Sequence, residues 1–201
     1  MKKIPTLYVK EYENNKLKEL KRDVTPGLEF ILTDPEVIPT IKWDGSCCAI
    51  INGEFYKRYD AKQGKTPPEG AIPCCEPDPI TGHWPHWVKV DTNNPSDKWF
   101  EAAYRNSADE FAEGNNVPVC KVKIPDGTYE AVGPHFQNNP YHLAKDVLIK
   151  HGVHPITLDM DFDSIREYLR HNYYEGIVFW YNNEPICKIK RKDYGFKWPV
   201  E

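Results

Sequence analysis

The sequence contains no long apolar segment and no excess of basic residues. No stretch of its 201 residues approaches the roughly 18–20 consecutive apolar residues that are needed to cross a bilayer. Residues 1–15 also lack the apolar run of a secretory signal peptide. The formal net charge is −4 at pH 7, so any contact with nucleic acid must come from a local basic patch. We therefore expect a soluble, cytoplasmic protein without a membrane partner.

The cysteines lack the two-residue gap that is typical of paired zinc ligands. Two adjacent pairs, Cys47-Cys48 and Cys74-Cys75, are accompanied by Cys120 and Cys187. Neighbouring strand residues point to opposite faces, so the members of the first pair are not expected to bond each other. Without a secretory signal, reduced thiols are the default. A zinc site at Cys74, Cys75, His83 and His86 is the weaker alternative, because prolines crowd that loop.

What is present indicates one sizeable domain, since 40% of the residues are apolar and 13% are aromatic. Apolar runs between turn residues predict strands at 28–32, 37–41, 47–51, 55–59, 117–124, 128–132, 147–149, 177–181 and 186–190. Helices are expected at 11–22, 98–111 and 163–172, and 62–96 is expected to be a long irregular segment. The pattern is typical of an α+β protein dominated by antiparallel strands, with a charged extension at 1–25 and a domain at 26–201.

Five charged elements each adjoin a predicted strand. In order, they are Lys42-x-Asp44-Gly45, Arg58, Glu130, Glu175-Gly176 and Lys188-x-Lys190. Asn52-Gly53 between two apolar runs predicts a hairpin, which places Lys42 one strand pair away from Arg58. Each element alone is weak. Lys-x-Asp-Gly is most often an exposed turn, and a run of lysines can simply protect an edge strand. The order of the elements carries the specificity.

This order resembles the covalent nucleotidyltransferase superfamily of ATP-dependent ligases and capping enzymes, and in particular a small family of 5′-3′ RNA ligases. The segments that carry the resemblance are Lys42-Trp43-Asp44-Gly45-Ser46-Cys47-Cys48, Glu130-Ala131-Val132-Gly133-Pro134, Glu175-Gly176-Ile177-Val178, Ile186-Cys187-Lys188 and Trp198-Pro199. It covers the chain from about residue 26 onward. It implies an adenylation domain of mainly antiparallel sheets flanked by helices, without a C-terminal OB-fold.

The resemblance also implies an activity and its partners. ATP would donate AMP to Lys42, with Mg²⁺ as the metal and Mn²⁺ as an alternative. The AMP would pass to the 5′-phosphate of an RNA, and a 3′-hydroxyl end would then displace it and seal the strand. We expect RNA repair by a monomer that needs no obligate protein partner. An RNA guanylyltransferase, a DNA ligase of the same superfamily and a non-catalytic RNA-binding module remain the alternatives.

Roles for individual residues follow from this chemistry. A lysine amine must lose its proton before it attacks, and burial and nearby cations both favour the neutral form. Lys188 and Lys190, two apart on one strand, can point the same way, lower the pKa of Lys42 and hold α-phosphate oxygens. Glu175 is the predicted metal ligand. By resemblance, Glu130 would accept from a ribose hydroxyl, and Arg58 would contact phosphate.

The resemblance fails at the adenine pocket. Where phage-type ligases carry an aromatic residue on a strand, this chain has Ile149, so Ile149, the stem of Lys150, or Phe136 is expected against the base. Ile41 precedes the nucleophile where several RNA ligases carry glutamate. Candidates to orient pyrophosphate are Lys57, Lys62 and Lys65, and Trp198 is a candidate surface for stacking RNA. The alternatives for the two glutamates are a turn cap at Glu175 and an ion pair between Glu130 and Arg58. Four histidines, His135, His142, His151 and His154, are interpreted as loop or packing residues.

Overall fold

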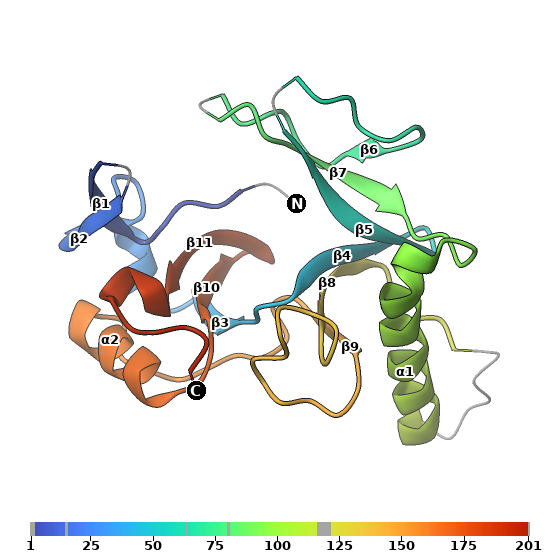
Figure 1. Cartoon of the computed structure of the whole chain (residues 1–201). Helices are drawn as coiled ribbons and strands as arrows, with labels where there is room; N and C mark the ends of the chain where they lie inside the picture. The colour runs from blue at the N-terminus through green and yellow to red at the C-terminus, as the bar shows by residue number, and fades with distance from the viewer. Residues whose placement is uncertain (1–2, 15, 63, 80, 116–121, 201) are drawn as a thin grey trace. The chain divides into compact units, whose positions relative to one another are not determined.

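The computed structural model describes residues 3–14, 16–62, 64–79, 81–115 and 122–200. These residues divide into two compact units, which are described separately (Figure 1). The six-stranded unit is Gly45–His151. The three-stranded unit combines Lys3–Asp44 with Gly152–Glu201.

The six-stranded unit is built on an antiparallel sheet of order β6-β7-β5-β4-β8-β9. Its strands are β4 (Ser46–Ile51), β5 (Glu54–Ala61), β6 (Ile72–Pro73), β7 (Trp84–Lys89), β8 (Gly127–Val132) and β9 (Val147–Lys150). The short helix η2 (Pro95–Asp97) leads into α1 (Lys98–Asn115). The helix packs on one face of the sheet, where Cys48, Ile50 and Tyr129 meet Ala103 and Ala108 in a buried cluster.

The predicted hairpin at Asn52-Gly53 is confirmed. Asn52 and Gly53 have φ values of 53° and 75°, and both must be positive in the two-residue turn that suits the twist of β4 and β5. The carboxylate of Asp126 accepts hydrogen bonds from the backbone N–H groups of Asn52 and Gly53 at 2.7 and 2.9 Å. This carboxylate satisfies donors that the turn leaves free, and it fixes the turn beside the start of β8.

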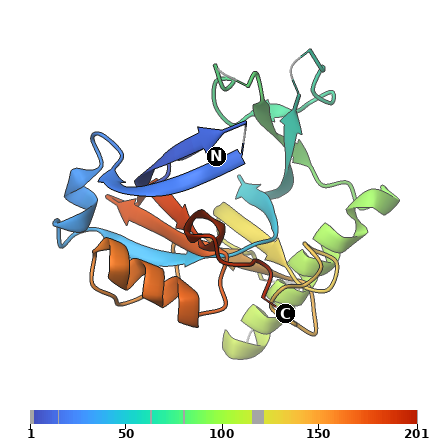
Figure 2. The same cartoon turned by 60° about the vertical axis from the view of Figure 1, so that its left-hand side comes forward.

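The three-stranded unit contains the sheet β11-β10-β3. Its elements are the hairpin β1 (Tyr8–Glu13) and β2 (Lys16–Val24), η1 (Glu29–Leu32), β3 (Ile38–Lys42), α2 (Phe162–His171), β10 (Gly176–Tyr181), β11 (Glu184–Lys190) and η4 (Arg191–Tyr194). Ile177, Phe179 and Ile189 on the sheet are fully buried together with Ile165 and Leu169 of α2. Figure 2 shows α2 alongside these strands. Because side chains alternate along a strand, the residues between them face away from this core.

The predicted helix at 163–172 is confirmed as α2, which begins and ends one residue earlier. Asp161 precedes it, and its carboxylate accepts from the backbone N–H groups of Asp163 and Ser164, both at 3.0 Å. Such a cap satisfies donors that the first turn of a helix leaves without an intrahelical partner. The predicted helix at 98–111 is also confirmed, as α1.

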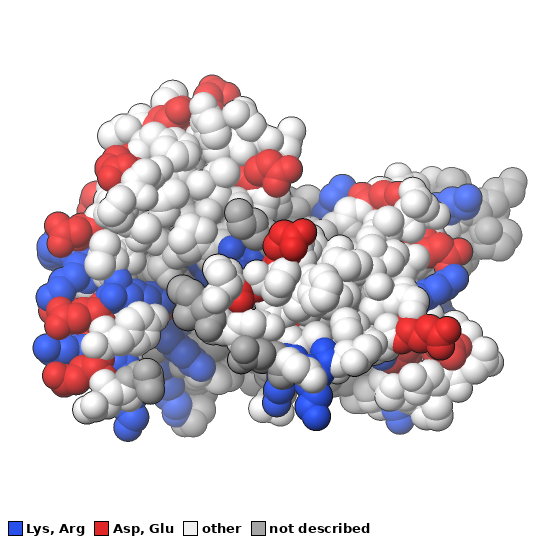
Figure 3. All heavy atoms as spheres, turned by 90° about the horizontal axis from the view of Figure 1, so that it is seen from above, with Lys and Arg blue, Asp and Glu red and all other residues white. Residues whose placement is uncertain are grey.

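The predicted helix at 11–22 is wrong, because these residues form the hairpin β1–β2. Leu17 and Leu20, three apart, suggested a helical stripe. The register shifts so that Glu11 pairs with Glu19 while Tyr12 pairs with Leu17. The extra residue between these pairs is a bulge that breaks strict alternation, so a spacing of three is compatible with a strand. Figure 3 shows the mixed basic and acidic side chains at the left of the view, where the hairpin lies.

The predicted strand at 28–32 is also wrong, because Glu29–Leu32 is the 3-10 helix η1. Leu28 and Ile31 are both buried, and residues three apart share a face in a 3-10 helix. The segment 62–96 is less irregular than expected, since it supplies β6 and β7. The expected burial of its aromatic residues is confirmed at His86 and Trp87.

Most of the predicted strand at 117–124 lies outside the described residues, and 122–125 carry no strand. The strands predicted at 37–41, 47–51, 55–59, 128–132, 147–149, 177–181 and 186–190 are confirmed to within a few residues at their ends. The α+β class with mainly antiparallel sheets is therefore confirmed. Within the described ranges, no helix is long and apolar enough to cross a membrane.

Candidate active site

Lys42 and Lys190 flank a glycine in the three-stranded sheet. Lys42 ends β3 and pairs with Gly176 of β10, and Gly176 in turn pairs with Lys190 of β11. Directly opposed residues share a face of a sheet, so the two lysine side chains lie on the face opposite the α2 core. Gly176 has no room for a side chain, because an added Cβ would lie 2.2 Å from the carbonyl oxygen of Ile189.

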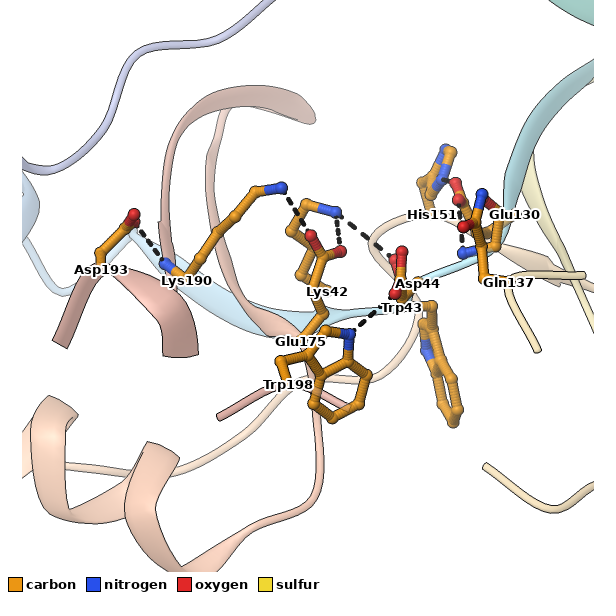
Figure 4. A network of polar contacts seen from close by, with 11 residues as sticks. Lys42, Trp43, Asp44, Glu130, Gln137, His151, Glu175, Lys190, Asp193 and Trp198 are labelled. Atoms are coloured by element: carbon orange, nitrogen blue, oxygen red, sulfur yellow. Dashed lines mark hydrogen bonds and ion pairs between the residues drawn. The ribbon is translucent and has the colours of Figure 1, made fainter. Parts of the chain in front are cut away.

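Glu175 joins the two lysines (Figure 4). Its side chain is largely buried. Oε2 contacts the Lys42 ammonium group, and Oε1 accepts from Lys190 Nζ at 2.5 Å. Each carboxylate oxygen therefore serves one lysine, and Glu175 is more than a cap at the start of β10. The sequence prediction that Lys42 and Lys190 lie together is confirmed, with Glu175 between them.

The charges of this cluster shift one another's ionisation. Burial would raise the pKa of Glu175, but Lys42 and Lys190 outweigh burial and lower it. Burial would lower the pKa of Lys190, yet attraction to Glu175 raises it. Burial, followed by repulsion from Lys190 and Lys42, lowers the pKa of Lys188 to about 8, and attraction to Glu175 does not offset these effects. The surroundings of Lys188 therefore favour loss of its proton, whereas those of Lys190 oppose it.

The loop that follows Lys42 is held by aromatic side chains. The Trp43 ring contacts the rings of His154 and Tyr174 edge-on, each with its centroid at 5.6 Å. Asp44 Oδ2 accepts from the indole Nε1 of Trp198 at 2.7 Å. Trp198 is only 7% exposed, so the prediction that it offers a surface for stacking RNA is wrong. A buried indole that donates to a carboxylate has a packing and anchoring role.

The outer edge of β11 is covered at Lys188. Its backbone N–H donates to the carbonyl of Pro5 at 3.0 Å, and its carbonyl accepts from the N–H of Leu7 at 2.8 Å. The interpretation of the terminal lysines as an unpaired edge is therefore wrong at Lys188. Leu7 is fully buried in the core of the unit, which fixes this segment in place. Residues that showed no resemblance to the ligase family thus contribute to the surroundings of the lysines.

The remaining predicted site residues lie on the six-stranded sheet. Glu130 pairs with Ile149 on one side and with Cys47 on the other. The β4–β5 register places Arg58 next in the same row, and Arg58 pairs with Trp87. This row lies on the face of the sheet opposite α1, because the alternate residues enter the α1 core. Three residues predicted from separate motifs thus share one face.

Glu130 is held at both carboxylate oxygens (Figure 4). Oε1 accepts from the backbone N–H of Gly45 at 3.0 Å, and Oε2 lies 3.0 Å from His151 Nε2. Arg58 instead donates to Asp60 at 2.8 Å, so the alternative of an ion pair between Glu130 and Arg58 is wrong. His151, interpreted as a loop or packing residue, does lie in the turn after β9, and its contact with Glu130 is the feature that the sequence did not predict. No sequence signal singles it out, since its contact depends on the β8–β9 register.

Three predicted residues have surroundings that differ from those of Lys42. Ile41 pairs with the buried Ile177, so alternation directs it to the face opposite Lys42. Lys57 contacts the buried Asp97 and lies on the α1 side of its sheet. Lys57 therefore lies on the opposite face of the sheet from Arg58, and its assignment to pyrophosphate stays a prediction. Ile149 remains beside Glu130, as its strand position predicts.

Carboxylates, histidines and thiols do not assemble elsewhere into a metal site. Among the described residues, no group of three or more such side chains is placed to hold a metal ion. Cys74 and Cys75 are free thiols. Glu175 is the carboxylate in contact with Lys42, and a single carboxylate suits an ion whose other ligands are water and substrate phosphate.

Comparison with known proteins places the chain in a family. The family model for RNA ligase 1 matches residues 72–201. The chain belongs to the RNA ligase 1 family. RNA ligase 1 of Danio rerio is 27% identical over an alignment of 139 positions that covers 59% of this chain and 43% of that protein. RNA ligase 1 of Pongo abelii is 26% identical over 224 aligned residues, 81% of this chain and 69% of that protein. The RNA ligase 1 match includes Glu130, Glu175, Lys188 and Lys190, and begins after Lys42.

Proposed function

We propose that this protein is an ATP-dependent RNA ligase of the nucleotidyltransferase fold that forms a covalent bond between Lys42 and AMP. Membership of the RNA ligase 1 family supports RNA as the substrate. The observation that carries the proposal is the contact of one buried carboxylate, Glu175, with both Lys42 and Lys190. Lys188, with a lowered pKa, lies beside them. This arrangement provides a nucleophile, cations for phosphate oxygens and a carboxylate in one place.

In the first step, Lys42 Nζ attacks the α-phosphorus of ATP. A nitrogen–phosphorus bond forms, the bond from phosphorus to the pyrophosphate oxygen breaks, and pyrophosphate leaves. The ammonium group must lose a proton and separate from Glu175 before its lone pair can react. Phosphate oxygens that enter beside Lys188 and Lys190 would provide the counter-charge that Lys190 otherwise finds in Glu175. Glu175 would then be released from part of its ion pairing.

The transition state of this step spreads negative charge over the phosphate oxygens, so fixed cations provide most of the stabilisation. Lys188 and Lys190 are fixed by β11, because their backbone is paired on the sheet. A bound Mg²⁺ would neutralise further phosphate charge. Glu175 fits as its one protein carboxylate, since Mg²⁺ commonly binds through one or two carboxylates together with phosphates and water.

Two further steps complete the joining reaction. The 5′-phosphate of an RNA end displaces Lys42 from the AMP phosphorus, which frees the lysine and leaves AMP linked to the RNA. A 3′-hydroxyl of the second end then attacks the RNA phosphate and expels AMP. Arg58 and Glu130 share one face of the six-stranded sheet with Ile149. We assign Arg58 to a contact with phosphate, Glu130 to a contact with the ribose, and Ile149 to a contact with the base.

The direct test is transfer of label from α-labelled ATP and Mg²⁺ to the protein, read on a denaturing gel. Wild type should be labelled and Lys42→Ala should not. Lys192→Ala is the matched control, because Lys192 is an exposed lysine of η4, which follows β11. Equal labelling of wild type and Lys42→Ala would exclude Lys42 as the nucleophile. Unlabelled wild type that still binds RNA would instead favour a non-catalytic RNA-binding protein.

Substrate preference distinguishes the proposed RNA ligase from a guanylyltransferase and from a DNA ligase, which would use the same lysine chemistry. Labelling with ATP in preference to GTP is expected, and a GTP preference would indicate a guanylyltransferase. Labelled protein should transfer AMP to RNA with a 5′-phosphate and seal it to a 3′-hydroxyl. Sealing of DNA ends in preference to RNA ends would contradict the RNA assignment.

A further inference from the structure

Glu130 connects the first and last residues of the six-stranded unit. Gly45 begins this unit and His151 ends it. The Glu130 carboxylate accepts from the Gly45 N–H through Oε1 and contacts the His151 ring through Oε2, both at 3.0 Å. The Glu130 and His151 side chains are only 12% and 16% exposed. One carboxylate therefore holds the two places where the chain enters and leaves this unit.

The His151 ring is oriented through both of its nitrogens. Nδ1 lies 3.0 Å from the Thr128 hydroxyl, and Nε2 faces Glu130. The backbone N–H of His151 also donates to the carbonyl of Thr128 at 3.1 Å. Because a carboxylate only accepts hydrogen bonds, Nε2 carries the proton that it donates to Glu130. The imidazole is thus a fixed donor that determines where Oε2 lies.

These contacts leave capacity on Glu130 for a ligand. An ionised carboxylate has about four acceptor positions, and Gly45 and His151 use two of them. The side chain stands between Ile149 and Cys47 on the sheet face opposite α1. A hydroxyl group of a bound molecule can therefore donate to Glu130 without displacing either partner. The carboxylate would have lost most of its freedom to rotate before the ligand arrives.

We propose that His151 is a positioning residue that aims Glu130 at a ribose hydroxyl of the nucleotide, so that discrimination against deoxynucleotides depends on His151. The inference rests on the proposed function, in which Glu130 contacts the ribose. His151 touches neither the nucleotide nor the reacting atoms. Its effect is to keep one carboxylate oxygen in the orientation that a hydroxyl donor needs. A site that is built to bind a hydroxyl rejects the analogue lacking it, because its polar group is then left without a partner.

The test compares labelling of the protein by ATP, 2′-deoxy-ATP and 3′-deoxy-ATP in wild type, His151→Ala and His151→Gln. Loss of the imidazole should lower the efficiency of labelling by ATP about 10-fold, the size of one well-aligned hydrogen bond to a charged group. Labelling by the deoxy analogue that lacks the recognised hydroxyl should change less than about 2-fold, because that contact is already missing. The ratio between ATP and that analogue should therefore fall in His151→Ala. Glutamine, whose amide can donate to Glu130, should restore part of the ratio.

His142→Asn is the matched control, because His142 is an exposed histidine of the same unit, and asparagine tolerates its positive φ of 53°. It should leave the ratio unchanged. Equal loss of labelling by ATP and both analogues in His151→Ala would show that His151 only supports the sheet, and the inference would be overturned alone. Wild type that accepts no label from ATP would overturn the proposed function, and the inference with it.

Discussion

The indole nitrogen of Trp198 donates to Asp44 Oδ2 at 2.7 Å, and this bond ties the end of the chain to the loop that follows Lys42. Trp198 is buried, so the bond lies in a place where water competes poorly. Trp43, between Lys42 and Asp44, is held by its own contacts with Tyr174 and His154. The backbone immediately after the proposed nucleophile is therefore anchored by residues that are far away in the sequence.

Trp198→Phe should test this anchor, since phenylalanine keeps most of the ring and removes the donor. We expect a loss of about 1.5–3 kcal/mol in the free energy of unfolding, the usual range for a hydrogen bond to a charged acceptor. Labelling of Lys42 should slow more than this loss explains, because the loop would hold the lysine less firmly. Denaturant unfolding and single-turnover labelling measure the two effects. Trp99→Phe, at a partly exposed tryptophan of α1, is the control, and equal labelling rates in the two variants would contradict the anchor.

Gly45→Ala should destabilise the protein through a backbone clash. An added Cβ would lie 2.1 Å from the carbonyl oxygen of Ala131, which belongs to β8 and cannot rotate away. Forced shifts of this kind cost about 1–3 kcal/mol, and the hydrogen bond from Gly45 to Glu130 would weaken with them. Gly114→Ala is the control, because nothing lies within 4 Å of its added Cβ and alanine favours a helix by up to about 1 kcal/mol. Similar unfolding curves for the two variants would show that β8 shifts to accommodate the added Cβ at residue 45 with little loss of stability.

Local patterns were sufficient where the contacts that decide an element lie close in the sequence. The hairpin at Asn52-Gly53 and the cap at Asp161 are set by a few neighbouring residues, and both are found. The β1–β2 hairpin could not be predicted this way. Its bulge lies opposite the step from Glu11 to Tyr12, and it removes the alternation on which a strand prediction depends.

The predictions for the site also succeeded only where they depended on contacts that are local in the sequence. Lys188 and Lys190 were expected on one face because strands have a period of two, and β11 agrees with this. The partner of Glu130 could not be read from the sequence, because His151 reaches it only through the pairing of Glu130 with Ile149. The cover over Lys188 also depends on tertiary structure, since Pro5 and Leu7 pair there from the other end of the chain.

Arg191→Ala should cost much of the stability of the three-stranded unit. The guanidinium group is buried and donates to backbone carbonyls at the end of α2 and in the C-terminal segment. These acceptors belong to Leu169, Arg170, Asn172 and Lys197. The last carbonyls of a helix have no intrahelical donor and carry partial negative charge, so a buried cation satisfies both needs. Removal should cost about 2–4 kcal/mol in the free energy of unfolding.

Denaturant unfolding checks this value, and Arg191→Lys should recover little because an ammonium group lacks the planar fork that reaches several carbonyls. Lys192→Ala, at the exposed neighbouring residue, should change stability by less than about 0.5 kcal/mol. If Arg191→Ala unfolds at the same denaturant concentration as Lys192→Ala, the helix end does not need the guanidinium group.

Lys188→Met should stabilise the protein at neutral pH, and the advantage should shrink as the pH rises. Burial, then repulsion from Lys190 and Lys42, lowers the pKa of Lys188 to about 8 from an ordinary value of 10.5. Below pH 8 both the folded and the unfolded chain carry the proton, and the folded chain bears the cost of the charge. Between these two pKa values the unfolded chain binds more protons, so the stability of wild type rises with pH. Methionine keeps the apolar stem without the charge and shows no such gain.

Unfolding of wild type and Lys188→Met at pH 7, 8, 9 and 10 therefore isolates the titration, because every other group is common to both proteins. The free energy of unfolding of Lys188→Met should exceed that of wild type by on the order of 1 kcal/mol at pH 7. The gain is no larger because water at the partly exposed ammonium group screens part of the repulsion. Lys192→Met removes one positive charge from an exposed residue of η4, just after β11, and corrects for the change in net charge. If the stability advantage of Lys188→Met instead grows between pH 8 and 10, attraction to Glu175 stabilises the charge of Lys188 more than repulsion from Lys42 and Lys190 destabilises it. The two lysines proposed to bind phosphate would then both be paired in the free protein, and under the proposed function ATP would have to break both pairs to bind.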